Sequence, residues 1–290
     1  MDMQPIVAIL YDFDKTLSPR DMQDYAFIPG IQMTPEAFWE KCLQTMNGNQ
    51  MDQILAYMLV MIQEAQKKAF PLSREVFRKL GSCVELFEGV DTWFSRINGY
   101  AAKKGLAVEH YIISSGLKEI IEGTKIAGEF KRIYAAEYCY DESGEPIWPA
   151  MAVNYTSKTQ FLFRINKGVL DVTQHRELNE FTPENKRRIP FRNMVYIGDG
   201  LTDVPCMRLV KENHGHSIAV YQGNEKELVN RMLSQGRVDF VAPARYTETG
   251  EMEKILFLVM DQIAATAKTT GLHMAQMDGA QALMEKGNPE

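Results

Sequence analysis

Short apolar runs alternate with amphipathic segments along most of the chain. Residues 5–13, PIVAILYDF, form a continuous apolar run with β-branched residues, which indicates a strand buried on both faces. We expect four further strands, at residues 108–116, 193–200, 216–223 and 238–246. Helical patterns separate them at residues 87–105, 202–212 and 224–236. Strands that alternate with helices predict a parallel sheet with both faces covered.

The region after the first strand has a different character. From about residue 19 to residue 81 the pattern is helical, and helix starts are expected at Thr34-Pro35 and at Ser73. Residues 51–69 predict a helix with a broad apolar face. We therefore divide the chain into an α/β core (residues 1–18 and 82–250), a helical cap (residues 19–81) and a C-terminal helical extension (residues 251–290).

The remaining segments predict smaller elements. A helix is expected at residues 117–128, and a strand, a polar turn and a second extended piece are expected over residues 131–150. Residues 157–168 predict a helix, and the polar, proline-containing segment 169–191 predicts a surface loop. The last stretch, residues 269–290, predicts a Met-rich helix followed by a polar end. This stretch is not needed to complete the predicted sheet.

Composition narrows the class of protein. With 290 residues, 45% of them hydrophobic, the chain can bury a sizeable core, and its net charge of −6 argues against nucleic acid as the main partner. Four cysteines lie far apart without a CxxC pair, which favours reduced thiols and a cytoplasmic location over zinc or disulfides. The N-terminus lacks the features of a signal peptide, and no apolar run approaches the roughly 20 residues of a membrane span. No feature of the sequence predicts an oligomeric state.

Polar residues gather at the ends of the predicted strands. Asp12 and Asp14 follow the first strand, and Ser114, Ser115 and Gly116 follow the second. The segment GDGLTD, which contains Asp199 and Asp203, follows a later strand, and a helix begins near Lys158. In a parallel sheet all these strand ends meet at one rim, which is where sites lie in such folds.

These segments resemble the motifs of the haloacid dehalogenase-like superfamily. DFDKT at residues 12–16 is similar to its DxDx[TV] motif, YIISS to its strand-plus-serine motif, and IGDGLTD to its GDGxxD motif, with Lys158 as the best match for the motif lysine. The resemblance covers roughly residues 5–245 and is to the phosphatase branch with a helical cap, of which phosphoserine phosphatases are members. It implies a Rossmann-like, doubly wound parallel sheet with an inserted cap domain.

The resemblance also implies roles for individual residues. Asp12 is expected to attack phosphorus and to carry an aspartyl-phosphate, and Asp14 to act as general acid and then as general base. Ser114 would donate a hydrogen bond to a phosphoryl oxygen, and Lys158 would neutralise the remaining negative charge. Backbone N–H groups near Ser115 and Gly116 could add donors to the substrate.

Electrostatics supports a metal at the same rim. Two unit charges about 4 Å apart repel by roughly 4 kcal/mol at an effective dielectric of about 20, so a phosphate dianion would not approach several carboxylates unaided. Hard oxygen ligands favour Mg²⁺. The ligands that the resemblance implies are Asp12, the backbone carbonyl of Asp14, and Asp199, with Asp203 ligating directly or steering a bound water.

Some assignments keep alternatives at this point. Ser115 could replace Ser114, and Lys167 or Lys186 could replace Lys158, although Lys167 lies near the far end of the same predicted helix. Lys15 lies inside the first motif, where its side chain could reach either substrate or solvent. The histidines match no metal-site spacing.

The resulting hypothesis is a Mg²⁺-dependent phosphomonoester hydrolase that acts on a small phosphorylated metabolite. A phosphotransferase or phosphomutase of the same superfamily would use the same residues, and a catalytically retired binding module is the alternative from another class. A nucleotide-binding doubly wound protein is disfavoured, because DFDKTL has no glycine after the first strand.

The predicted cap helix bears on the substrate. Phosphoserine phosphatases require a cap group that pairs with the substrate carboxylate, and an arginine serves that purpose. Residues 51–65 hold no Arg or Lys, and Tyr57 stands about where the arginine is expected. We therefore expect phosphoserine to be a poor substrate and neutral, apolar or aromatic leaving groups to be preferred, unless Arg20 or Arg74 supplies the missing charge.

Overall fold

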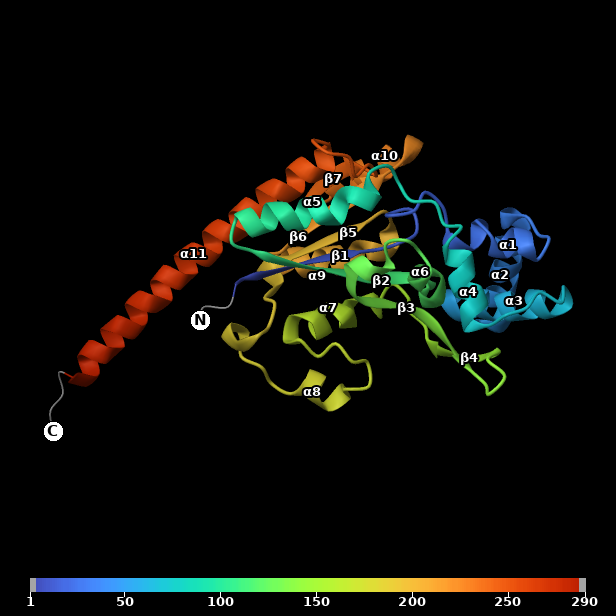
Figure 1. Ribbon diagram of the computed structural model, residues 1–290, viewed down its shortest axis with the longest axis horizontal. Helices are drawn as coiled ribbons and strands as arrows, with labels where there is room; N and C mark the ends of the chain where they lie inside the picture. The colour runs from blue at the N-terminus through green and yellow to red at the C-terminus, as the bar shows by residue number, and fades with distance from the viewer. Residues whose placement is uncertain (1–3, 287–290) are drawn as a thin grey trace.

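A computed structural model describes residues 4–286 of the chain and shows a seven-stranded sheet with helices on both faces (Figure 1). The strands are ordered β4-β3-β2-β1-β5-β6-β7, and every neighbouring pair is parallel except β3 with β4. The predicted doubly wound α/β fold is confirmed. The strands are β1 (Ile6–Tyr11), β2 (Ala107–Leu117), β3 (Phe130–Tyr140), β4 (Pro146–Met151), β5 (Met194–Gly198), β6 (His216–Tyr221) and β7 (Phe240–Pro243).

The central strand β1 buries its two faces in different hydrophobic clusters. Val7 and Ile9 point into a cluster that includes helix α5 (Val90–Lys103) and the first half of helix α11 (Glu251–Lys286). Ala8 and Leu10 point the other way, into a second cluster. That second cluster includes helices α7 (Lys158–Lys167), α9 (Val204–Glu212) and α10 (Lys226–Ser234). An apolar run without alternation is the sequence of such a doubly covered strand.

A helical insertion, residues 19–81, lies between β1 and α5 in the chain, at the end of the sheet where the parallel strands finish (Figure 1). Both predicted helix starts are confirmed, because the Thr34 hydroxyl accepts from the Ala37 N–H at 3.3 Å and the Ser73 hydroxyl from the Val76 N–H at 3.2 Å. Such N-caps satisfy otherwise unpaired donors. The insertion contains a 3-10 helix (Met22–Asp24), α1 (Phe27–Gly30), α2 (Pro35–Asn49), α3 (Gln53–Lys67) and α4 (Arg74–Gly81).

The helix expected at residues 117–128 is shorter than predicted. Helix α6 spans Lys118–Glu122, and a separate 3-10 helix follows at Ala127–Glu129. The reason is the close approach of α4. A Cβ atom on Gly81 would lie 2.1 Å from the carbonyl oxygen of Ile120, and one on Gly123 would lie 1.8 Å from that of Arg78. The two glycines let the two backbones touch, and α6 ends at this contact.

The segment expected as a surface loop, residues 169–191, contains three short helical turns. They are α8 (His175–Asn179) and two 3-10 helices (Glu184–Lys186 and Phe191–Asn193). The guanidinium of Arg164, on α7, is buried and donates to the carbonyl oxygens of Asp171 at 2.7 Å and Val172 at 3.0 Å. This side chain anchors the start of the segment to the core.

Helix α11 is one continuous helix from residue 251 to residue 286, as expected for the helical extension, but it is not separate from the core. Its first half is part of the core, with Met252, Leu256 and Met260 buried, and an ion pair joins Glu253 to Arg96 of α5. The extension that we placed at residues 251–290 therefore leaves the body of the protein only after about residue 264.

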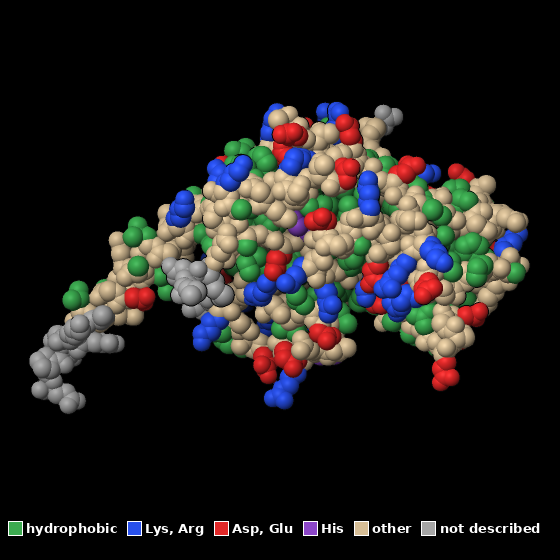
Figure 2. All heavy atoms as spheres, in the orientation of Figure 1, with side chains coloured by type: hydrophobic (Ala, Val, Ile, Leu, Met, Phe, Trp, Pro, Cys, Tyr) green, Lys and Arg blue, Asp and Glu red, His purple; other side chains and the backbone are tan. Residues whose placement is uncertain are grey.

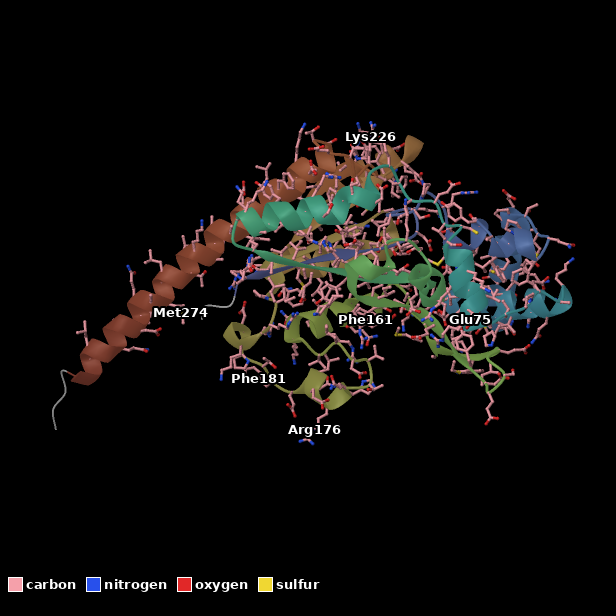
Figure 3. The ribbon with its side chains drawn as sticks, viewed as in Figure 1. Glu75, Phe161, Arg176, Phe181, Lys226 and Met274 are labelled. Atoms are coloured by element: carbon pink, nitrogen blue, oxygen red, sulfur yellow. The ribbon has the colours of Figure 1, made fainter. Side chains whose placement is uncertain are left out.

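The remainder of α11, which carries the exposed Met274, projects from the body (Figure 3), and hydrophobic side chains are visible along the projecting part (Figure 2). No helix within residues 4–286, α11 included, has the length and apolar character needed to cross a membrane.

Candidate active site

The first motif lies directly after β1, at the centre of the rim. The Asp12 N–H donates to the carbonyl oxygen of Ile197 at 2.9 Å, so Asp12 lies beside the end of β5. Its Oδ1 accepts from the Phe13 N–H at 2.7 Å, and the carbonyl oxygen of Phe13 accepts from the Leu17 N–H at 2.8 Å. The chain thus turns sharply at the strand end and holds the Asp12 carboxylate at the rim.

Lys158 joins the first motif to the last. Its Nζ, fully buried, lies 3.0 Å from Oδ2 of Asp12 and donates to Oδ1 of Asp203 at 2.8 Å. Burial alone would lower the pKa of Lys158, but the two carboxylates outweigh it and raise that pKa. The alternative lysines lie elsewhere, since Lys167 donates to two carbonyl oxygens of the 169–191 segment and Lys186 belongs to a 3-10 helix of that segment.

Asp203 is held by more than the lysine. The Tyr196 hydroxyl donates to its Oδ1 at 2.8 Å, and the Gly200 N–H donates to its Oδ2 at 3.3 Å. A Cβ atom on Gly198 would lie 2.5 Å from this carboxylate, so only glycine fits there. Asp203 is therefore a fixed, fully bonded group, whereas Asp199 faces the open cavity.

Three carboxylates at the rim could hold a cation. Oxygen atoms of Asp12, Asp199 and Asp203 lie within 4.8 Å of one another. Burial raises the pKa of Asp12 to about 6, although the attraction of Lys158 lowers this pKa by more than the repulsion from Asp203 raises it. Burial, followed by repulsion from Asp203 and Asp12, also raises the pKa of Asp199. Carboxylates that repel one another in a buried place, with oxygen as the only donor type, fit a hard divalent cation such as Mg²⁺.

Asp14 has a separate environment on the insertion side of the rim. Its Oδ1 accepts from the Met22 N–H at 2.9 Å, and a Cβ atom on Gly116 would lie 2.9 Å from its Oδ2. Burial, followed by repulsion from Asp21 and Asp12, raises the pKa of Asp14 well above its usual value. A carboxyl group that retains its proton in this way can serve as a proton donor.

The serine motif follows β2 and faces the same space. Ser114 is buried at the cavity wall, and its Oγ accepts from the Gly116 N–H at 3.0 Å. The carbonyl oxygen of Ser115 accepts from the Tyr57 hydroxyl at 2.8 Å, which ties α3 of the insertion to the rim. Ser114, Ser115, Gly116 and Tyr57 all line the cavity.

A cavity of about 690 Å³ lies between the rim and the helical insertion. Rim residues and insertion residues contribute to its wall in roughly equal numbers. From the rim come Asp12, Asp14, Lys15, Ser114, Ser115, Gly116, Asn154, Tyr155, Asp199 and Thr202, and from the insertion come Asp21, Gln23, Trp39, Cys42, Leu43, Met46, Met51, Asp52, Gln53, Ile54 and Tyr57.

Several of these residues carried no distinctive signal in the sequence. Trp39 and Gln23 reach the cavity only because the insertion folds back over the rim, and Asn154 reaches it from the loop before α7. Asp52 had a signal of another kind, since it precedes an apolar run and caps α3, accepting from the Ile54 N–H at 2.9 Å. Lys15, left open above, lines the cavity, and its Nζ lies 3.2 Å from a carboxylate oxygen of Asp21.

The two arginines considered as partners for a substrate carboxylate are engaged elsewhere. Arg20 lies over the ring of Tyr25, 4.2 Å from its centroid. Arg74 pairs with Glu137 at 3.2 Å and lies over the ring of Tyr140. Neither belongs to the cavity wall.

Comparisons with known proteins agree with the α/β fold described above. An uncharacterized protein of Borreliella burgdorferi is 29% identical over 294 aligned residues, covering 89% of this chain and 99% of its own. A HAD family hydrolase from Salmonella enterica serovar Typhi superposes with a TM-score of 0.58 at 17% identity, covering 90% of this chain and 74% of that one. A substrate-bound phosphoserine phosphatase gives 0.52 at 14% identity, covering 86% and 96%.

The two structural likenesses show a shared fold. The family model for haloacid dehalogenase-like hydrolases matches residues 9–208, a range that contains Asp12, Ser114, Lys158 and Asp203. This chain therefore belongs to the haloacid dehalogenase-like hydrolases.

Proposed function

We propose that this hydrolase is a Mg²⁺-dependent phosphatase that cleaves the phosphomonoester of a small metabolite through an aspartyl-phosphate on Asp12. The observation that carries the proposal is the joint position of a lysine-paired Asp12 and a protonatable Asp14 at the wall of one cavity. A nucleophile and an acid whose environments differ in this way suit a two-step transfer.

In the first step Asp12 supplies the nucleophile. An Oδ atom of Asp12 forms a bond to phosphorus while the bond from phosphorus to the leaving oxygen breaks. Asp14 gives its proton to that oxygen, so the alcohol leaves neutral. Lys158, paired with Asp12 at 3.0 Å, keeps a positive charge beside the nucleophile throughout.

In the second step water replaces the alcohol. Asp14, now a carboxylate, takes a proton from a water molecule. The oxygen of that water attacks phosphorus, and the bond between phosphorus and Asp12 breaks. Inorganic phosphate is released and both aspartates return to their starting states. Ser114, which lines the cavity, would donate a hydrogen bond to a phosphoryl oxygen.

The residues that would hold Mg²⁺ are Asp12, Asp199 and the backbone carbonyl of Asp14, with Asp203 orienting a ligand from behind. When bound, the cation offsets the negative charge of the carboxylates and of the phosphate. Lys158 and Tyr196 fix Asp203, and Asp199 is the least buried of the three clustered carboxylates.

We also propose that the helical insertion acts as a cap and that the enzyme works in the cytoplasm. The insertion supplies about half of the cavity wall and is bonded to the rim through Tyr57, which suits a lid that excludes water from the reacting groups. Fluorescent-protein fusions or cell fractionation would test the location.

A screen of phosphorylated metabolites tests the proposed reaction. Purified protein with Mg²⁺ is expected to release inorganic phosphate from at least one ester and from the general substrate p-nitrophenyl phosphate, and Asp12→Asn is expected to release none. Transfer of the phosphoryl group to a second substrate without net release would indicate a phosphotransferase instead. Failure of every ester in the presence of Mg²⁺ would indicate a binding protein.

A further inference from the structure

The wall of the cavity carries more negative charge than positive. Among the lining residues whose side chains the structure describes, Lys15 is the sole cation on the open wall, and it is paired with Asp21. Asp52, on the insertion, has no ion-pair partner within the described residues. A leaving group beside Asp52 therefore meets a carboxylate that no ion pair neutralises.

The contacts of Asp52 leave its charge in place. Its Oδ1 accepts from the backbone N–H groups of Ile54 at 2.9 Å and Leu55 at 3.3 Å, at the start of α3. Its Oδ2 accepts from Nδ2 of Asn154 at 3.0 Å. These are neutral donors, which fix the side chain across the boundary between insertion and core without supplying a positive charge.

Gln23 supplies an independent sign of a missing ligand. The side chain lines the cavity and is only 2% exposed, yet its Oε1 has no hydrogen-bond partner among the described residues. A buried acceptor without a donor costs about 1–3 kcal/mol, so such groups are usually satisfied by a ligand or water. A ligand with N–H groups, or with C–H groups that carry partial positive charge, would suit an acceptor of this kind beside the cavity.

Two aromatic rings complete this region. Trp39 and Tyr57 line the cavity with their ring centroids 6.2 Å apart and their planes at 69°. Their polar groups are already used, because Nε1 of Trp39 donates to Asp24 at 3.2 Å and the Tyr57 hydroxyl donates to the carbonyl oxygen of Ser115. Only ring surfaces remain for a ligand, and ring surfaces attract cations.

From these three features we infer that the substrate is the phosphomonoester of an amino alcohol, with a primary or quaternary ammonium that lies between Asp52, Gln23 and the Trp39–Tyr57 rings. The inference rests on the proposed phosphatase function and specifies its leaving group. It revises the expectation of a neutral or apolar leaving group, which follows from the absence of Arg and Lys in residues 51–65 but leaves out the negative charge of Asp52 in the same segment. In phosphoserine a carboxylate lies beside the ammonium. Asp52 would repel this carboxylate, and the sole cation among the described lining residues, Lys15, is already paired with Asp21.

Matched pairs of substrates test the charge of the leaving group. Phosphocholine is compared with its carbon isostere, 3,3-dimethylbutyl phosphate, and phosphoethanolamine with 2-hydroxyethyl phosphate, all with Mg²⁺. At least one cationic ester is expected to exceed its neutral partner in kcat/KM by about tenfold or more, which corresponds to roughly 1.4 kcal/mol. L-phosphoserine is expected to fall below phosphoethanolamine by at least the same factor. The pair with the larger cationic-to-neutral ratio of kcat/KM shows whether the site prefers a primary or a quaternary ammonium.

Two variants connect that preference to the residues. Asp52→Asn keeps a side chain that can cap α3 and removes the charge, and Gln23→Met keeps the volume and removes the acceptor. Each is expected to reduce the cationic-to-neutral ratio of kcat/KM severalfold or more. Glu75→Gln is the matched control, because Glu75 is an exposed carboxylate in the first turn of α4, on the insertion but outside the cavity wall (Figure 3), and its ratio should equal that of the wild type.

The outcomes separate the two proposals. If the protein hydrolyses p-nitrophenyl phosphate but shows no cationic preference, or if phosphoserine is the best ester, the inference about the leaving group is overturned and the phosphatase function stands. If Asp52→Asn keeps the full preference, Asp52 does not bind the ammonium and the inference is again overturned. A protein that hydrolyses no ester at all overturns the proposed function, and the inference with it.

Discussion

The Nζ of Lys158 lies 3.0 Å from Oδ2 of Asp12, with neither side chain more than 9% exposed. The same nitrogen donates to Asp203 at 2.8 Å, so a single buried cation stands between two carboxylates from different strand ends. This contact joins the first and last motifs of the chain, which are almost two hundred residues apart in sequence, and most of the predictions below concern it.

Replacing Lys158 by Met should impair both stability and turnover. Removing one partner of a buried ion pair costs roughly 3–5 kcal/mol, because the remaining charge is left uncompensated. Chemical denaturation should show a loss of that order, and kcat should fall by at least about two orders of magnitude, as for the loss of other charge-stabilising groups. Lys167→Met, at the other end of the same helix, is the control and should keep near-wild-type kcat; a similar loss of kcat there would contradict the assignment of Lys158.

Asp12→Asn should abolish turnover while the fold persists. An amide oxygen does not attack phosphorus, so no phosphoenzyme can form on this residue. Phosphate release and circular dichroism, measured on the same preparation, should show no activity and an unchanged spectrum. Activity above a few per cent of wild type would place the nucleophile elsewhere.

The same variant should reveal how ionised Asp12 affects stability in the absence of metal. Burial raises the pKa of Asp12 to about 6, which means that the folded state holds the proton more tightly than the unfolded state does. The wild type therefore loses stability as the pH rises from about 4 through 6, whereas Asp12→Asn has no such proton. In the presence of chelator, the stability of the wild type relative to the variant should therefore fall by an amount on the order of a few kcal/mol between about pH 4 and pH 6. A difference that does not change with pH would contradict the raised pKa.

Asp14→Asn should separate the two steps of the reaction. The variant cannot protonate an alkoxide, so alkyl phosphates should be turned over at a small fraction of the wild-type rate. With p-nitrophenyl phosphate, whose leaving group needs no proton, Asp12 should still be phosphorylated, and a burst of nitrophenol should appear before slow turnover. Hydrolysis of alkyl phosphates at the wild-type rate would remove Asp14 from the acid–base role.

Activity should depend on a small divalent cation. Chelation should stop phosphate release, Mg²⁺ should restore it, and Ca²⁺ should inhibit because it prefers more ligands and looser geometry. Asp199→Ala should raise the Mg²⁺ concentration needed for half-maximal activity more than any single change outside the rim does, with Glu75→Gln as the reference. Full activity in excess chelator would exclude the metal site.

Much of the core and of the rim could be predicted from the sequence, because each depends on local patterns. The apolar run at residues 5–13 indicates a strand by itself, and DFDKT and GDGLTD follow their strands directly. Lys158 could be placed by its position at the start of a helix. These signals span a few residues each, and the parallel sheet then brings them together.

Other features depend on contacts between distant segments and had no local signal. Helix α6 ends early because Gly123 meets the backbone of Arg78. Gln23 and Trp39 reach the cavity only through the way the insertion packs on the rim. The sequence of the buried half of α11 resembles that of any amphipathic helix. This half is buried because it packs against α5.

The packing of α11 on α5 bears on the order in which the protein can acquire its structure in the cell. Strand β1, which is synthesised before the other six strands of the sheet, becomes the centre of that sheet, but one side of the layer is closed only by residues much later in the chain, such as Met252 and Leu256. A nascent chain that has all of its motifs therefore still exposes an apolar face until the last helix has emerged. Completion of the core is in this sense a late event, because it waits for residues that are synthesised well after the last motif.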